Sequence, residues 1–110
     1  MNVHPLEGLL AETADLLEGA RAVEVGAGGA TEWRLDGVAF AACANGVAEF
    51  RLRREVAAAA LRTPDVATSA RGAGWVRFAP ALLDEFGTDR ARAWFESAWR
   101  FADEGWAGTE

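Results

Sequence analysis

The alternation of apolar and polar residues is clearest over residues 31–52, where it predicts three antiparallel strands. Asp36-Gly37 separates the first two apolar runs. This dipeptide favours a two-residue type I′ turn, because both central residues of that turn need positive φ. The turn would place Trp33 opposite Phe40 on one face of the sheet.

The connection at Asn45-Gly46 is compatible with two registers. A two-residue loop would put Phe40 on the same face as Glu49, whereas a three-residue loop that includes Ala44 pairs Phe40 with Phe50. A slip of one residue moves a whole strand to the other face. We predict the three-residue loop, because it gathers the apolar side chains on one core face: Trp33, Leu35, Val38, Phe40, Ala42, Ala48, Phe50 and Leu52.

Two helices and two further strands are predicted around these hairpins. Helical spacing predicts an amphipathic helix over residues 5–18, and alternation predicts a first strand over residues 21–25. A second helix is predicted over residues 53–61, followed by a loop or weak extended segment over residues 65–73. The last strand, residues 74–78, is expected to point Val76 and Phe78 inward, with Trp75 over an edge.

The C-terminal part of the chain predicts a short helical turn and then a long helix. The turn would run from Pro80 to Phe86 and be broken by Gly87, and the helix would begin at residue 88 or 89 and end near residue 101. Its aromatic stripe is typical of a core-facing helix. We expect Trp94 to be buried against the sheet face that carries Trp33.

These elements predict a single α+β domain spanning residues 1–110. It would contain an antiparallel sheet of about five strands with two or three helices packed on one face, and residues 105–110 would be frayed. A chain of 110 residues is long enough for one core. Its longest uncharged apolar run, residues 38–44, is far shorter than the roughly 18 residues that a membrane span needs.

Charge is unevenly placed along a chain whose net charge is −6. Residues 1–50 hold two Arg and eight acids, residues 51–79 hold six Arg and two acids, and residues 80–110 hold three Arg and seven acids. An acidic chain disfavours non-specific binding to nucleic acid, but its basic segment could still contact an anion.

The candidate chemistry does not indicate an enzyme. His4 and Cys43 are the only histidine and cysteine, so neither a catalytic triad nor a usual zinc site can be assembled. Residues 23–30 are similar to the glycine-rich first motif of S-adenosylmethionine-dependent methyltransferases, but a hairpin follows them where those enzymes have a helix. We therefore predict no cofactor. The single cysteine and the absence of a signal peptide predict a cytoplasmic location.

Two surfaces are candidates for binding. The first is a set of arginines with one tryptophan, suited to phosphate or acidic protein; the alternative is that the arginines pair with the Glu and Asp of the flanking helices. The set contains Arg51, Arg53, Arg54, Arg62, Arg71, Trp75 and Arg77. The second is the outer face of the sheet, whose small side chains would let a second copy or another protein approach closely: Ala39, Ala41, Cys43 and Val47. The alternative for this face is that long Arg and Glu side chains cover the alanines.

The order of the elements, with Gly74-Trp75-Val76 in the last strand and Ser97-Ala98-Trp99 in the last helix, resembles the MmcQ/YjbR-like proteins. These are small bacterial α+β domains with a frataxin-like layout. The resemblance implies a DNA-binding or otherwise unassigned module without established chemistry. Together with the residues, it predicts an uncharacterised binding or interaction module. The alternative is a weak DNA- or anion-binding protein that uses the segment from Arg51 to Arg77.

Overall fold

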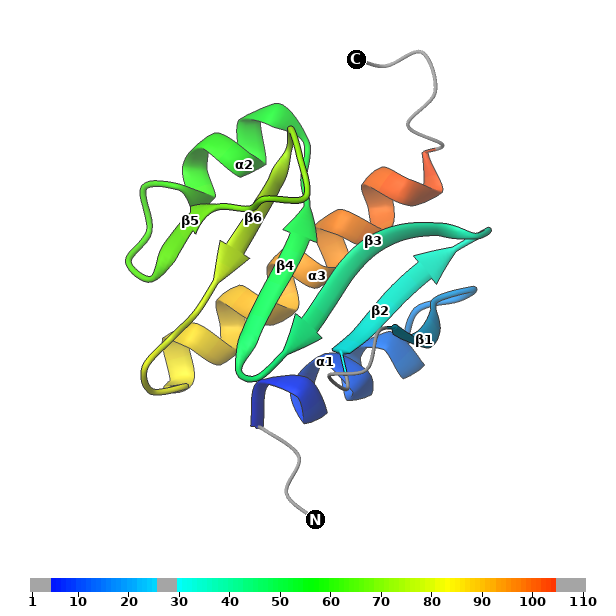
Figure 1. Ribbon diagram of the computed structural model, residues 1–110, viewed down its shortest axis with the longest axis horizontal. Helices are drawn as coiled ribbons and strands as arrows, with labels where there is room; N and C mark the ends of the chain where they lie inside the picture. The colour runs from blue at the N-terminus through cyan, green and yellow to red at the C-terminus, as the bar shows by residue number, and fades with distance from the viewer. Residues whose placement is uncertain (1–4, 26–29, 105–110) are drawn as a thin grey trace.

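The computed structural model describes residues 5–25 and 30–104, which form a layer of helices and a layer of strands (Figure 1). The helices are α1 (Pro5–Asp15), α2 (Arg54–Ala60) and α3 (Glu85–Asp103). The strands are β1 (Arg21–Val25), β2 (Ala30–Leu35), β3 (Val38–Ala44), β4 (Val47–Arg51), β5 (Val66–Thr68) and β6 (Trp75–Phe78). Three parts of the sequence analysis lie outside the described residues: His4, residues 26–29 of the glycine-rich segment and the predicted frayed tail, residues 105–110.

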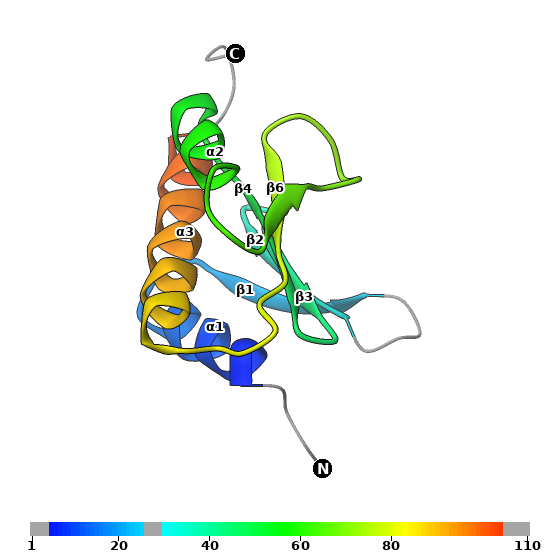
Figure 2. The same ribbon diagram turned by 90° about the vertical axis from the view of Figure 1, so that its left-hand side faces the viewer.

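The strands form one antiparallel sheet in the order β1-β2-β3-β4-β6-β5. All three helices lie on the same side of this sheet, and its other side, called here the outer face, carries none of them (Figure 2). The predicted α+β class is thus confirmed, with six strands where about five were expected. None of the helices in the described ranges is long and apolar enough to cross a membrane.

Both predicted hairpins form, but the second has a different loop from the one predicted. Asp36 and Gly37 have φ values of 53° and 82°, as a type I′ turn requires. Asn45 and Gly46, with φ of 52° and 78°, form a second two-residue turn, because Ala44 pairs directly with Val47. The predicted three-residue loop is therefore wrong.

A β-bulge in β3 allows Phe40 to face the core even though the second turn has only two residues. The register shifts between the pairs Arg34–Ala39 and Trp33–Ala41, so that Phe40 is an extra residue in β3. Phe40 stays on the helix side, where its ring lies 5.3 Å from that of Phe95. Beyond the bulge, the facing of β3 is reversed relative to the prediction.

This reversal corrects the predicted dimer face. Ala41 pairs with Phe50 and Cys43 pairs with Ala48, and both are buried in the core rather than on the outer face. Their place on the outer face is taken by Ala42 and Ala44, which pair with Glu49 and Val47. Of the four residues predicted for a dimer contact, Ala39 and Val47 remain on the outer face.

The core lies between the sheet and α3, with Phe95 at its centre. The Phe95 ring makes edge-to-face contacts with Trp33 and Phe40, each at 5.3 Å between ring centroids. Trp94 is only half-buried and packs over Phe78 at 5.3 Å. The prediction that Trp94 is buried against the sheet face that carries Trp33 is confirmed only in part. Trp94 packs on that face over Phe50 and Phe78 but is half-buried, and Phe95 makes the contact with Trp33.

The start of α3 also differs from the prediction. The predicted helical turn from Pro80 and the break at Gly87 do not form, because α3 begins at Glu85 and runs through Gly87. Asp84 is the N-cap, and its carboxylate accepts a hydrogen bond of 2.7 Å from the backbone N–H of Gly87. A Cβ at position 87 would lie 3.3 Å from this carboxylate and from Leu83, so glycine here makes room for the cap.

Candidate functional site

The predicted arginine set does not form one patch. The β6 residues Trp75 and Arg77 lie on the outer face of the sheet, because Val76 and Phe78 alternate with them and are buried in the core. Arg71, from the preceding loop, reaches over the same face to Glu32 and Glu49. Arg53, Arg54 and Arg62 belong to α2 and its two ends. The set is therefore divided between the outer face and the end of the sheet where α2 packs.

The structure forms a pocket of about 470 Å³ where β4, α2 and the C-terminal end of α3 meet. Two of the predicted residues, Arg51 and Arg54, line it together with residues that sequence reasoning did not single out: Leu52, Ala57, Ala58, Leu61, Ala73, Gly74 and Phe101. Its volume falls within the range of about 300–1,000 Å³ that is typical of small-molecule sites. The described lining residues include two cations and no acid.

Elements from distant parts of the chain position this lining. Gly74 has a φ of 82°, and its carbonyl accepts a hydrogen bond of 2.9 Å from the Leu52 N–H. A Cβ at position 74 would lie 3.2 Å from the Leu52 carbonyl oxygen, so both the backbone angle and the space favour glycine. The loop after Ser69 thus closes one side of the pocket, opposite α2.

Phe101 is shared between the pocket and the arginines beside it. The Arg51 guanidinium carbon lies 5.8 Å from the centre of the Phe101 ring, and that of Arg53 lies 5.1 Å from it, both within cation–π range. Arg53 also pairs with Glu104 at the end of α3. Arg54 is exposed and makes no hydrogen bond or ion pair with the part of the chain that the structure describes. Arg54 is therefore the pocket cation best placed to pair with a ligand.

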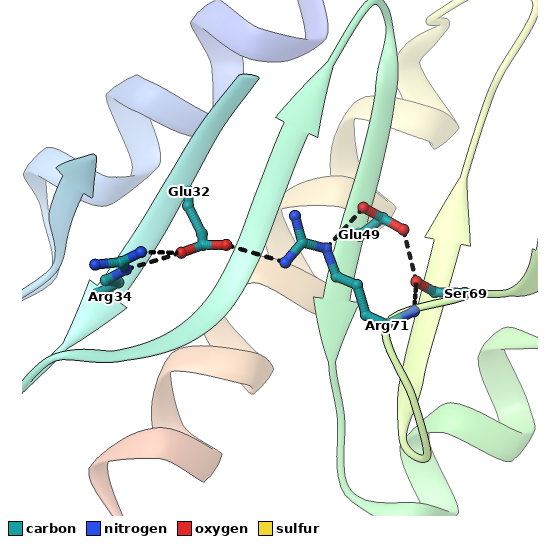
Figure 3. A network of polar contacts seen from close by, with 5 residues as sticks. All are labelled: Glu32, Arg34, Glu49, Ser69 and Arg71. Carbon is teal, nitrogen blue, oxygen red and sulfur yellow. Dashed lines mark hydrogen bonds and ion pairs between the residues drawn. The ribbon is translucent and has the colours of Figure 1, made fainter. Parts of the chain in front are cut away.

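On the outer face, Arg71 bridges two carboxylates that belong to different strands (Figure 3). It donates from Nη1 to Glu32 at 3.0 Å and from Nε to Glu49 at 2.9 Å. Arg34 also donates to Glu32, at 2.8 Å, and Ser69 Oγ donates to Glu49 at 2.6 Å. Arg71 is therefore paired with acids, but these come from strands β2 and β4 and not from the flanking helices, as the alternative to a binding patch had predicted.

The ion pairs in this network shift two pKa values. Burial alone would raise the pKa of Glu32, but hydrogen bonds from Arg34 and Arg71 outweigh it and hold the pKa below its ordinary value. Burial would lower the pKa of Arg71, and its bonds to Glu49 and Glu32 raise it instead. The network is charged at neutral pH, so Arg71 does not offer a free guanidinium to an anion.

Trp75 and Arg77 complete the outer face near this network. Arg71 lies over the ring of Trp75, with 5.2 Å between its guanidinium carbon and the ring centre. Arg77 is exposed. Its backbone lies opposite that of Glu49 in the ladder between β4 and β6, and its side chain makes no ion pair with the described residues. Arg62 is also exposed, beyond the C-terminal end of α2, and it does not line the pocket.

Cys43 is not a reactive thiol in this fold. Burial in the core, with a smaller effect from the charge of Glu7, raises the pKa of Cys43 to about 12. A thiol with this pKa is almost entirely protonated at neutral pH and is a poor nucleophile. Among the described residues, no three His, Cys, Asp or Glu side chains gather as a metal site would require.

The apolar pocket residues were missed by sequence reasoning. Residues such as Phe101 look like core residues in a helical pattern, and nothing in the local sequence indicates that the core is open at this end. The expected cover of long Glu and Arg side chains over an alanine of the outer face does form, but the alanine is Ala42, which Glu32 and Glu49 both oppose. Comparison with known protein families, with curated proteins and with solved structures finds no match to this chain.

Proposed function

We propose that this chain is a non-enzymatic binding module, and that its pocket binds a ligand with an anionic group on an apolar body. The observation that carries this proposal is the lining of the pocket, in which Arg51 and Arg54 are the two charged residues among otherwise apolar described residues. A guanidinium pairs well with either a carboxylate or a phosphate. The apolar residues provide area that the remainder of such a ligand would bury.

The chemistry of the described residues supports binding over catalysis. Catalysis normally requires convergent titratable groups in a cleft. Among the described lining residues, the titratable groups are two guanidinium groups, which cannot act as a general base at neutral pH because arginine remains protonated. The buried thiol of Cys43 lies in the core and does not line this pocket.

Amphipathic probes of matched length test this proposal. We expect n-octyl phosphate and octanoate to bind, and n-octanol and n-octylamine to bind far more weakly, as followed by titration of backbone amide NMR signals. The largest shifts should occur at residues 52, 57, 58, 61, 73 and 74. Comparing the two anions shows whether phosphate or carboxylate fits better. Equal affinity for all four probes would contradict a role for the arginines.

Two arginine variants separate a site effect from a charge effect. Arg54→Ala should weaken octyl phosphate binding at least about tenfold, because a hydrogen bond to a charged group contributes about 1.5–3 kcal/mol and about 1.4 kcal/mol corresponds to a tenfold change. Arg90→Ala removes the same charge from an exposed position on α3 that does not line the pocket. An equal loss in both variants would show that only net charge matters.

A DNA-binding role is the alternative, and we expect it to be weak. Arg53 and Arg71 are already paired with carboxylates, and the chain carries a net charge of −6. Affinity for duplex DNA should be no tighter than the usual non-specific range of about 10⁻⁴ to 10⁻⁶ M at physiological salt. A submicromolar, salt-sensitive complex that the double variant Arg53→Ala, Arg54→Ala abolishes would favour DNA over the apolar anion.

Three further expectations from the sequence stay predictions. These are membership of the MmcQ/YjbR-like proteins, a cytoplasmic location and a homodimer or protein partner on the outer face. Of the four residues predicted for the homodimer contact, the structure leaves Ala39 and Val47 on that face.

A further inference from the structure

The loop between β5 and β6, residues 69–74, forms one wall of the pocket but has little apolar anchoring of its own. Its residues 70–73 are exposed, and none has a side chain in the core. Gly72 and Gly74 have φ values of 135° and 82°, which are accessible to glycine at little cost. Polar contacts must therefore contribute much of what holds this loop in place.

Those polar contacts converge on Arg71 (Figure 3). The backbone N–H of Arg71 donates to Ser69 Oγ at 3.1 Å, and Ser69 Oγ donates in turn to Glu49. The Arg71 side chain reaches across the outer face to Glu49 on β4 and Glu32 on β2. The loop is thereby tied to two strands of the sheet, by an arginine whose side chain is 30% exposed and by carboxylates that are 12% and 24% exposed.

The outer face of the sheet leaves space for the Arg71 side chain between Glu32 and Glu49. Glu32 and Glu49 both pair with Ala42, so the two carboxylates flank a single small residue on the middle strand. Ala42 is only 2% exposed although it lies on the outer face and outside the core cluster. A larger side chain at position 42 would fill the space that Arg71 uses to reach both acids.

We infer that the Glu32–Arg71–Glu49 bridge is a positioning device that holds the Ala73–Gly74 wall and so sets the affinity of the pocket. The part that concerns affinity rests on the proposed function. Arg71 does not line the pocket, so its effect on a ligand acts through the loop. The competing explanation is that backbone bonds suffice, chiefly those from Leu52 N–H to the Gly74 carbonyl and from Ser69 N–H to the Trp75 carbonyl.

Two measurements on one set of variants decide between these explanations. The first is the dissociation constant for n-octyl phosphate, and the second is hydrogen exchange at the backbone amides of Leu52, Ser69 and Trp75. The test variant is Arg71→Gln. The matched control is Arg77→Gln, which removes the same charge from the same face without breaking a hydrogen bond to the described residues.

For Arg71→Gln we expect at least about fivefold weaker binding and faster exchange at these three amides, as is usual when a coupled network is broken. Arg77→Gln should change neither property by more than about twofold. Arg71→Lys should recover part of the affinity, because an ammonium group keeps the charge but cannot form both planar contacts at once. Glu49→Gln should resemble Arg71→Gln while leaving every arginine intact.

The outcomes that overturn the inference differ from those that overturn the proposed function. If Arg71→Gln exchanges faster in the loop but binds the probe as the wild type does, the bridge does not control the pocket. If exchange in the loop is unchanged, backbone bonds hold the wall and the inference fails. If the wild type binds no probe, the proposed function fails, and the exchange data alone decide whether the bridge holds the wall.

Discussion

Truncation of Phe95 should be the most destabilising single change in α3. Its side chain is fully buried and contacts the rings of Trp33 and Phe40 from above the sheet. Core Phe→Ala substitutions cost about 3–5 kcal/mol, and each edge-to-face pair adds about 0.5–1.5 kcal/mol to simple burial. Because Phe95 makes two such pairs, we expect a loss near the upper end, about 4–5 kcal/mol. This is a large part of the roughly 5–15 kcal/mol that stabilises a small domain.

The neighbouring residue is the natural comparison. Trp94 is larger, but it is half-buried and lies over Phe50 and Phe78 at the border of the core. Trp94→Ala should therefore cost about 2 kcal/mol, roughly half of what full burial would give. Urea denaturation followed by far-UV circular dichroism measures both losses, and Phe95→Leu, expected at about 1–1.5 kcal/mol, covers the case in which Phe95→Ala does not fold. A larger loss for Trp94→Ala than for Phe95→Ala would refute the assigned helix face.

Three further predictions concern pH, capping and association. Because the pKa of Glu32 is lower in the folded than in the unfolded chain, its contribution is complete above its ordinary pKa of 4.5 and is lost as pH falls through the folded value. The stability difference between wild type and Glu32→Gln, measured by denaturation, should therefore shrink below about pH 4.5 and stay constant near neutrality. Asp84→Ala should cost about 1 kcal/mol through loss of the cap, and Asp84→Asn much less, with equal losses excluding a capping role. If the outer face forms a homodimer, Val47→Arg should yield monomers in light scattering, and a wild type that is already monomeric removes that prediction.

Most of the fold follows from local patterns in the sequence. The Asp36-Gly37 turn, the apolar alternation in β2 and β4 and the helical spacing of α3 each have a local physical cause, and these elements form near where they were expected. The second turn is one residue shorter than predicted, and α3 begins at Glu85 rather than at residue 88 or 89. The inward facing of Val76 and Phe78 is confirmed for the same reason. The errors lie where two local rules compete and only the packing decides between them.

The bulge at Phe40 is the clearest such competition. Asn45-Gly46 favours a two-residue turn, while the apolar pattern of β3 demands that Phe40 face the core. Lengthening the loop satisfies the pattern at the cost of the better turn. The protein keeps the two-residue turn and the inward Phe40 by placing one extra residue in β3. The sequence after Phe40 does not indicate this bulge, because its small residues, mostly alanine, fit either face of the sheet. Ala41 and Cys43 were misplaced for that reason.

The arginine set shows why charge along a sequence predicts so little about a surface. Residues 51–77 have a net positive charge in sequence, yet the carboxylates that neutralise Arg71 come from β2 and β4, and the one that pairs with Arg53 comes from the end of α3. Tertiary packing brings these acids within hydrogen-bond distance although they are up to 51 residues away along the chain. Only the arginines at the end of the sheet then stand beside exposed apolar area. A search for binding sites in such proteins should therefore begin with cations that the tertiary packing leaves without an opposing acid, as it leaves the α2 residue Arg54 among the described residues.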